Sequence, residues 1–408
     1  MTRATPLRVE NDTSVVVLRA AANCSGGGSL EADWAGAIAL DAPIAIAAGM
    51  FLSITGEDDD ALAEVLAGSQ SRMFEVSPGG GLTLTQLKLS GGTAAVGGGG
   101  AIYSNSADLT LDSCVFQGNV AIGGDGGAVW AAGGNVTILG GEFLGNNASG
   151  YGGAVAVAAT DTTAATRLFV QEGAKFEGNT ALVGGALYCS GKVMPSSTTS
   201  CSLSGTKFIS NIATGETEET ALFDDTSDGV DGGGAVAVRF ANANITDSLF
   251  FGNYAQYSGG ALLGGIGTDV TIDGGCEFED NTAVEYGGAI AASSLALGGG
   301  TELTNNTATS GGGAVSAIAQ HWRSRMFCYY YDAQRVQQLS CNTEHRTQLR
   351  GCAGHTDSCY SYSLLNFVRT RYKIFLGSKM GPFHEGKNRI LRHFTREQFR
   401  HIIFRTPV

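Results

Sequence analysis

Two short motifs recur together along most of the chain. Phe-x-x-Asn-x-Ala occurs as Phe116/Asn119, Phe143/Asn146, Phe176/Asn179, Phe208/Asn211, Phe250/Asn253 and Phe278/Asn281, with Leu303/Asn306 as a seventh copy in which Leu replaces Phe. Each copy is followed by Gly-Gly-Ala and an aliphatic residue, and an eighth such motif, with Ala101-Ile102, precedes the first Phe. The eight Gly-Gly-Ala motifs lie 27, 26, 32, 49, 26, 28 and 25 residues apart. A period in this range indicates a repeat architecture, in which each repeat packs on its neighbours.

The residues within a repeat decide which architecture forms. Gly makes up 61 of the 408 residues, and the apolar residues of the repeats alternate with a period of two. Leucine-rich repeats need several Leu and a helix per unit, propeller blades need about 40 residues, and helical solenoids need apolar residues at a 3.6 spacing. The remaining solution is an all-β parallel solenoid of about ten coils, with one coil per repeat.

Stacking explains the conserved spacing of Phe, Asn and Gly-Gly-Ala within the chain. Coils stack about 4.8 Å apart, so equivalent residues lie above one another. Phe then forms an apolar column, and Asn forms a ladder in which each side-chain carbonyl accepts from the amide of the next coil. Asn also tolerates the left-handed backbone of a corner, and Gly-Gly supplies positive φ. We assign structural roles, and no catalytic or metal-binding role, to Phe116, Asn119, Phe143, Asn146, Phe176, Asn179, Phe208, Asn211, Phe250, Asn253, Phe278, Asn281 and Asn306.

The ordered pair of motifs over residues 85–317 resembles the repeats of the chlamydial polymorphic outer membrane proteins and their relatives in algae and other microbes. Residues 51–56 and 82–84 are similar to the first coils of such proteins. The resemblance implies a right-handed, single-stranded parallel β-helix of the pectin-lyase-like type, at the cell surface and acting in adhesion. Residues 320–408 lack the alternating strands that end the bacterial members, which favours a secreted or eukaryotic surface protein.

Composition divides the chain near Ala319. Residues 1–319 hold 33 acidic and 10 basic side chains, whereas residues 320–408 hold 5 acidic and 15 basic side chains and all six His. We predict N-terminal coils and a cap at 1–90, the repeat β-helix at 91–319 with an acidic insertion at 214–231, and a basic Cys/His-rich tail at 320–408. The tail is expected to be irregular or partly helical, with a basic helix at 389–404, and to be disordered or an aberrant translation product.

Short alternating apolar segments predict strands at 15–18, 44–47, 51–55, 61–67, 73–76, 82–84 and 87–89. Cys189 and Cys201 flank a short loop and are the candidate disulfide of an exported protein, whereas most Cys are expected to be small buried residues. No apolar run reaches 18 residues, so we predict no transmembrane segment. No export signal is evident at the N-terminus.

Parallel β-helices also host polysaccharide lyases and glycoside hydrolases, which makes a pectate-lyase-like enzyme the alternative function. Carboxylates that such chemistry needs fall near repeat positions at Asp112, Glu142, Glu177, Asp247, Asp273, Glu277 and Glu279. Solvent-facing turn residues explain the same positions more simply. The insertion carries seven carboxylates and is a candidate Ca²⁺ site, with a solvated loop as the simpler interpretation; no other cofactor is predicted. The Cys spacings of the tail match no common zinc pattern.

These observations predict a non-enzymatic cell-surface or secreted β-helix, adhesin-like or structural, that binds glycans or proteins along its stacked faces and does not bind nucleic acid. A face of Ser, Thr, Asn and Ala favours this function, and a groove of clustered carboxylates with an Arg favours the enzyme. Six N-x-S/T sequons mark candidate glycan acceptors at Asn11, Asn23, Asn135, Asn147, Asn244 and Asn305. Asn147 and Asn305 adjoin the Asn column and are poor acceptors if that column is internal.

Overall fold

The computed structural model describes residues 6–57, 62–68, 71–160, 165–192, 199–215, 231–265, 267–321, 324–330, 339–341, 349–352, 359–362, 365–366 and 373–374, with side chains as far as Ser316. The chain divides into two compact units, Met1–Ser363 and Leu364–Val408. Among the described residues, the second unit contains one antiparallel strand pair, β44 (Leu365–Asn366) with β45 (Lys373–Ile374). All other described elements belong to the first unit.

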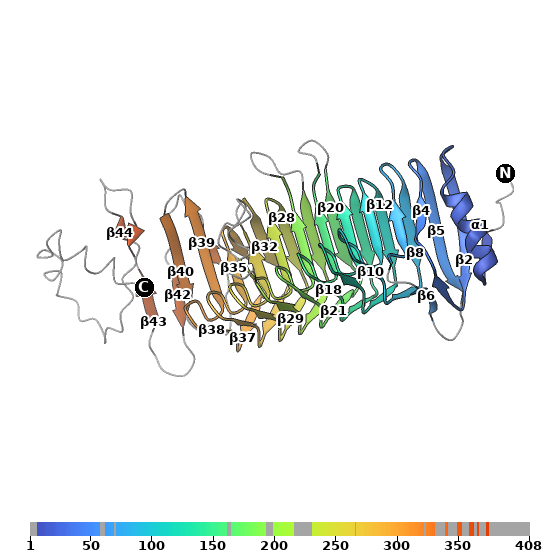
Figure 1. The fold of residues 1–408 in the computed structure, drawn as a ribbon. Helices are drawn as coiled ribbons and strands as arrows, with labels where there is room; N and C mark the ends of the chain where they lie inside the picture. Colours follow the sequence, from blue (N-terminus) through green and yellow to red (C-terminus); the bar gives the residue numbers. More distant parts are fainter. Residues whose placement is uncertain are drawn as a thin grey trace, which may run out of the picture. The chain divides into compact units, whose positions relative to one another are not determined.

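The first unit is built from four long sheets (Figure 1). Sheet A contains β1 (Leu7–Val9), β2 (Gly28–Ala35), β5 (Met50–Glu57), β8 (Gly81–Thr85), β12 (Asp108–Asp112), β16 (Asn135–Leu139), β20 (Arg167–Gln171), β24 (Ser200–Ser204), β28 (Asn242–Thr246), β32 (Asp269–Asp273), β36 (Leu295–Leu297) and β41 (Leu339–Cys341). Sheet B contains β3 (Ala37–Leu40), β6 (Ala63–Ala67), β9 (Leu87–Ser90), β13 (Val115–Gln117), β17 (Glu142–Leu144), β21 (Lys175–Glu177), β25 (Lys207–Ile209), β29 (Leu249–Phe251), β33 (Glu277–Glu279) and β37 (Glu302–Thr304).

Sheet C contains β4 (Ile44–Ile46), β7 (Phe74–Val76), β11 (Ile102–Asn105), β15 (Val129–Ala132), β19 (Val155–Ala158), β23 (Leu187–Ser190), β27 (Val236–Arg239), β31 (Leu262–Gly264), β35 (Ile290–Ala292), β39 (Val315–His321) and β40 (Ser324–Tyr330). Sheet D is made of two-residue strands, β10 (Thr93–Ala94), β14 (Val120–Ala121), β18 (Asn147–Ala148), β22 (Thr180–Ala181), β26 (Ile212–Ala213), β30 (Tyr254–Ala255), β34 (Thr282–Ala283) and β38 (Thr307–Ala308). A further antiparallel pair joins β42 (Leu349–Cys352) to β43 (Cys359–Tyr362).

The chain visits these sheets in a fixed cycle, which makes it a parallel β-helix. From β12 onward each coil adds one strand to sheet A, then to B, D and C, and each new strand pairs in parallel with its counterpart in the preceding coil. Numbering coils by their strands in sheet A, from β2 as coil 1 to β36 as coil 10, gives ten coils. The predicted all-β fold and the approximate number of coils are confirmed, and the colours of Figure 1 follow the coils in sequence order.

The core lies inside the coils, because alternate residues of each strand point inward. In sheet B the inward column runs through Val65, Leu89 and Phe116 and continues with the remaining repeat Phe residues to Leu303. Sheet A contributes two inward aliphatic columns, such as Leu82 with Leu109 and Leu84 with Leu111. All of these side chains are buried. Burial of aliphatic and aromatic area, at roughly 25 cal/mol per Å², is the main source of stability for such a core.

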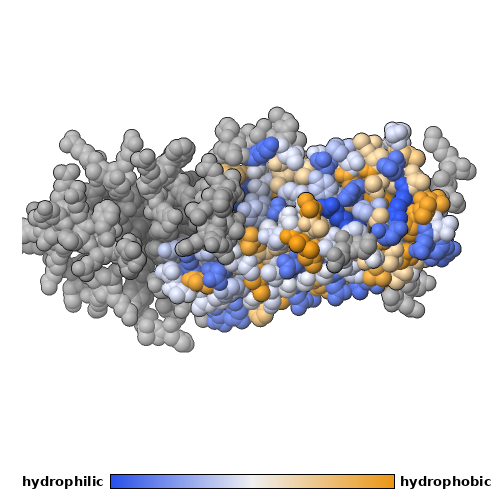
Figure 2. All heavy atoms as spheres, in the orientation of Figure 1, coloured by the Kyte–Doolittle hydropathy of each residue, from blue (hydrophilic) through white to orange (hydrophobic). Residues whose placement is uncertain are grey.

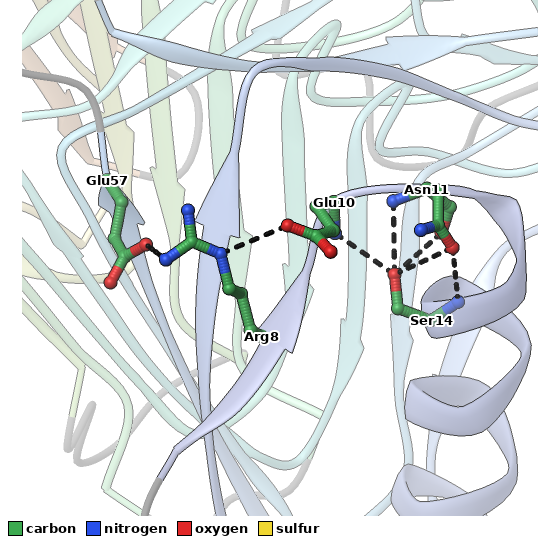
Figure 3. Close-up of polar contacts among 5 residues, drawn as sticks. All are labelled: Arg8, Glu10, Asn11, Ser14 and Glu57. Carbon is green, nitrogen blue, oxygen red and sulfur yellow. Dashed lines mark hydrogen bonds and ion pairs between the residues drawn. The ribbon is translucent and has the colours of Figure 1, made fainter.

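The N-terminal cap corrects one prediction. Residues 15–18 are not a strand but lie in helix α1 (Asp12–Ala22). Asn11 and Ser14 form a capping box that starts the helix, with the Ser14 N–H donating to Asn11 Oδ1 at 3.0 Å and the Asn11 N–H donating to Ser14 Oγ at 3.1 Å (Figure 3). Val15, Leu18 and Ala22 recur at helical spacing and are buried, so a local apolar run that resembles a strand forms the buried face of a helix.

The same end of the coil stack carries an ion-pair bridge. Arg8, the middle residue of β1, contacts Glu10 at 3.1 Å and Glu57 of β5 at 3.0 Å (Figure 3). Both pairs are substantially exposed, so they contribute little to stability. The short strand β1 is the edge strand of sheet A at this end. Helix α1 lies next to it and contacts β1, β2, β4 and β5.

The other predicted N-terminal strands correspond to β4 to β9, whereas the sequence did not indicate β2 and β3. Most of the acidic insertion (216–230) and the predicted helix at 389–404 lie outside the described residues. In the described part of the tail the backbone forms β40 to β45, so these short pieces are extended rather than helical. None of the described helices is long and apolar enough to cross a membrane.

Candidate functional site

The repeat Asn residues form a continuous internal ladder at the corner between sheets B and D. The Asn119 side-chain amide donates to Asn146 Oδ1 at 3.0 Å and to the Leu89 carbonyl at 3.1 Å, while the Asn119 backbone N–H donates to the same Oδ1 at 3.0 Å. This pattern repeats through Asn146, Asn179, Asn211, Asn253, Asn281 and Asn306. Six of the seven are buried and their amides are saturated with hydrogen bonds, so they have no free group for catalysis or ligand binding.

Two details of the ladder differ from the sequence-based expectation. The amide of each coil donates to the carbonyl of the following coil, so the polarity of the ladder is the reverse of the predicted one. The left-handed backbone at the corner belongs to the residue before each Asn, for example Gly252 with φ 62° and Asp280 with φ 55°. None of the ladder Asn residues has positive φ, because their side chains are needed inside the corner and the apex faces outward.

The repeat Phe residues stack beside the ladder. Ring centroids of consecutive Phe residues are 4.8, 4.6, 5.0, 4.9 and 4.5 Å apart from Phe116 to Phe278, and the rings are nearly parallel. Leu303 continues the column and is 3% exposed. The spacing equals that of neighbouring strands, so coil stacking rather than ring geometry dictates the arrangement.

The candidate carboxylates are spread over the outside of the coils. Asp112 and Asp273 end strands of sheet A, Asp247 lies at an exposed corner, and Glu142, Glu177, Glu277 and Glu279 are solvent-facing residues of sheet B. Within the described ranges, no three Asp, Glu, His or Cys side chains are grouped closely enough to hold a metal ion. The structure therefore does not bring these seven carboxylates together into one site.

Charge on sheet B is arranged as local pairs. Lys175 lies beside Glu142 in the register and contacts Glu177 at 2.5 Å, and the hydrogen bond with Glu177 raises the pKa of Lys175. Lys88 contacts Glu64 at 3.0 Å, and Glu64 also accepts from Ser90 Oγ at 2.6 Å, which lowers the pKa of Glu64. The Lys175–Glu177 pair lies within one strand, whereas the Lys88–Glu64 pair joins neighbouring coils and favours the parallel register.

The outer face of sheet A is polar and regular. Its central outward column places Ser53, Thr83, Thr110 and Thr137 one coil apart, and later coils continue it with Ser202, Asn244 and Thr271. Phe169 interrupts the column. A row of hydroxyl and amide groups at the strand spacing offers hydrogen-bond donors and acceptors to a partner, but it contains no nucleophile–base pair.

A second apolar layer covers part of the outside of sheet C. Ala156, Tyr188, Ala237, Leu263 and Ala291 occupy one outward column of that sheet, yet all are buried. Turns that precede the Gly-Gly-Ala motifs contribute to the cover: the rings of Tyr151 and Tyr188 stack at 4.8 Å.

The glycines explain how a turn can lie so close to the sheet. A Cβ on Gly288 would lie 2.0 Å from the Gly313 carbonyl oxygen, and Gly287 has φ 64°. Asp125 in one of these turns accepts from the Tyr151 N–H at 2.8 Å, and burial raises the pKa of its carboxyl group.

One exterior surface differs from coil to coil in the polarity of its residues. On either side of the B–D corner, coils 6, 9 and 10 expose polar residues, Glu177 with Thr180, Glu279 with Thr282 and Thr304 with Thr307. Coils 4 and 5 each combine one polar and one apolar residue there, Gln117 with Val120 and Asn147 with Leu144. Coils 7 and 8 place apolar residues there instead. We call this group the exterior patch, and it consists of Ile209, Ile212, Leu249, Phe251 and Tyr254.

The side chains of the exterior patch are adjacent and accessible. The register pairs Ile209 with Phe251 and Ile212 with Tyr254, so the patch spans two neighbouring strands in each of two sheets. Phe251 is 38% and Ile212 39% exposed, and the other members are half-buried. Lys207 lies beside Leu249 at its edge. Sequence reasoning missed the patch, although comparing the residues one and four positions after each repeat Phe would have found it.

The cysteines have two different environments. Cys189 of β23 and Cys201 of β24 form a disulfide with a Cα–Cα distance of 6.7 Å, as the spacing predicted. Cys114 and Cys276 are buried at the corner before sheet B, where other coils place Ala174, Thr206 or Thr301. Burial raises the pKa of Cys114 to about 12 and of Cys276 to about 11, so these thiols stay protonated and act as small core residues.

The remaining sequence-based candidates cannot be placed. The carboxylates proposed for Ca²⁺ lie at 216–230, outside the described residues, apart from Asp231. The Cys and His side chains of the tail also lie outside the described part of the chain. Figure 2 shows hydrophilic and hydrophobic residues interspersed on the face in view.

Comparison with known protein families finds a match to one segment of the β-helix. No curated protein matches the chain. A family model described as the Chlamydia polymorphic membrane protein repeat matches residues 275–293. This segment contains Phe278 and Asn281 of the two internal columns and the Gly-Gly-Ala turn before β35. Residues 275–293 are therefore similar to the repeat of the Chlamydia polymorphic membrane proteins.

Proposed function

We propose that the chain is a non-enzymatic surface protein of the adhesin type, and that its β-helix displays the exterior patch to a partner on another surface. The observation that carries the proposal is the clustering of apolar residues in two adjacent coils, at positions that neighbouring coils fill with Glu and Thr. Exposed apolar groups of this kind mark interaction sites when they are contiguous.

The fold and the matched repeat support a surface location. The matched model describes a repeat of membrane proteins, and the disulfide between Cys189 and Cys201 suits an oxidising compartment. The internal columns are saturated with hydrogen bonds and packing, so binding must use outward positions. Aliphatic and aromatic side chains favour a protein partner at the exterior patch, whereas the polar column of sheet A suits glycans.

The alternative function, a polysaccharide lyase or glycoside hydrolase on the same fold, makes a different prediction. An enzyme would release unsaturated or reducing ends from its polymer, and an adhesin would bind and release nothing. The purified chain should be applied to an array of acidic and neutral polysaccharides and to immobilised extracellular-matrix proteins. Binding without product supports the proposal, and product release from any polymer would overturn it.

A further inference from the structure

The asparagines of the six sequons differ in solvent exposure. Asn11, Asn23, Asn147, Asn244 and Asn305 are exposed, whereas Asn135 is half-buried. The side-chain amide of Asn135 donates to Asp108 Oδ1 at 3.0 Å, and its own Oδ1 is buried without a hydrogen-bond partner in the described residues. Asn147 and Asn305 adjoin the internal Asn column, but both are exposed, so their place beside the column does not shield them.

The exposed sequons of the coils suit a bulky substituent. Asn244 and Thr246 lie two residues apart on β28, so both point to the outer face of sheet A. The neighbours of Asn244 in the central outward column of sheet A are Ser202 and Thr271, whose side chains are short. Asn147 faces outward on sheet D, and Asn305 lies at the corner apex before Asn306. A glycan at these three positions extends into solvent without displacing a neighbouring coil.

The disulfide provides an independent reason to expect this chemistry. Disulfides persist in the secretory compartment of eukaryotic cells, where N-glycosylation also occurs. Cys189 lies in sheet C and Cys201 in sheet A, and both are buried, so the disulfide is part of the folded core.

We propose that the chain accepts N-linked glycans at the three exposed sequons of its coils, Asn147, Asn244 and Asn305, and that the folded protein carries none at Asn135. In the transfer step the asparagine Nδ2 forms a bond to the anomeric carbon of a lipid-diphosphate-linked oligosaccharide. The bond from that carbon to the phosphate oxygen breaks, the lipid diphosphate leaves with the electron pair of that bond, and the amide nitrogen releases one proton to solvent. The exterior patch itself contains no sequon, and the glycan site in its sheet, Asn147, lies two strands from Ile212.

The full chain, fused to a cleavable secretion signal and produced in eukaryotic cells, tests this proposal. Secreted, protease-resistant protein should be treated with peptide N-glycosidase in ¹⁸O-labelled water and its peptides analysed by mass spectrometry. We expect label at Asn147, Asn244 and Asn305 and none at Asn135. Asn244→Gln should remove one glycan, and Asn135→Gln should remove none. Unlabelled coil sequons, or label at Asn135 in the wild-type protein, would overturn the proposal; the wild-type peptides decide this even if a variant is not secreted.

Discussion

Phe250 and Phe251 are neighbours in the sequence but belong to different regions of the molecule. Phe250 is fully buried in the stacked column of sheet B, and Phe251 is 38% exposed in the exterior patch. The same contrast separates Asn253 inside the corner from Tyr254 outside it. Interior positions are the same in nearly every coil because each must fit the coils on both sides. Exterior positions have no such constraint, so a departure there needs an explanation other than folding.

The largest expected effect concerns the interior column. Phe250→Ala removes a ring that stacks on Phe208 at 4.9 Å and on Phe278 at 4.5 Å, and leaves a cavity between coils. We expect a loss of about 3–5 kcal/mol in the free energy of unfolding, measured by urea denaturation. Phe251→Ala is the matched control and should change stability by less than about 0.5 kcal/mol. Equal losses for the two variants would contradict the division between interior and exterior.

The disulfide tests whether the coils near the patch need a covalent link. Replacing Cys189 and Cys201 together by Ala removes a link across 12 residues of chain. We expect a loss of about 3 kcal/mol, because the unfolded chain regains the entropy of the open loop. Urea denaturation with and without a reductant measures it: the wild-type protein should respond to reduction and the double variant should not. A wild-type protein insensitive to reductant would show that the two thiols are not linked.

The Asn ladder is expected to matter less than the Phe column. Asn281→Leu deprives the Asn253 amide and the Asn253 backbone N–H of their acceptor and leaves the Phe250 carbonyl without its donor. Unsatisfied buried groups of this kind cost roughly 1–3 kcal/mol. Chemical denaturation of the variant measures this cost. No loss of stability would mean that solvent reaches the column.

The smallest expected effect is a pH dependence in the outer layer of sheet C. Burial raises the pKa of Asp125 in the folded protein, so its ionisation opposes folding and this contribution to stability declines as pH rises through the folded pKa. Asp125→Asn cannot ionise and should gain stability relative to the wild type between about pH 3 and pH 7. Thermal unfolding of both proteins across this range measures the difference. A constant difference would show that the carboxyl group is hydrated in the folded protein.

The fold could be predicted from the sequence because stacked coils require the same residues at the same positions in each repeat. Seven repeat Asn residues, with six Phe residues and one Leu in register beside them, leave few alternatives to a parallel β-helix, and the structure has that architecture. Helix α1 was missed because Val15 to Leu18 reads locally as a strand, and the capping by Asn11 and Ser14 is a weaker signal. Sheet D was missed because two-residue strands have no periodicity of their own.

The candidate site was harder to predict, because it depends on which exterior residues share a face. Ile209 and Phe251 are 42 positions apart in the sequence, and only the parallel register makes them neighbours. The carboxylates singled out from the sequence lie near repeat positions, yet they do not form one site, because the coils place them in two sheets and at a corner.

The most direct test of the proposed role of the exterior patch is a binding measurement on one combined variant. Ile209→Gln, Ile212→Thr, Phe251→Thr and Tyr254→Thr give coils 7 and 8 neutral polar residues that other coils place at these positions, as Gln117, Thr180, Thr304 and Thr282. The variant and the wild-type protein should be compared on the polysaccharide and matrix-protein arrays, with urea denaturation of both. We predict at least a tenfold loss of binding with the unfolding midpoint unchanged. Equal binding by the two proteins would contradict the proposal that this surface is the adhesive one.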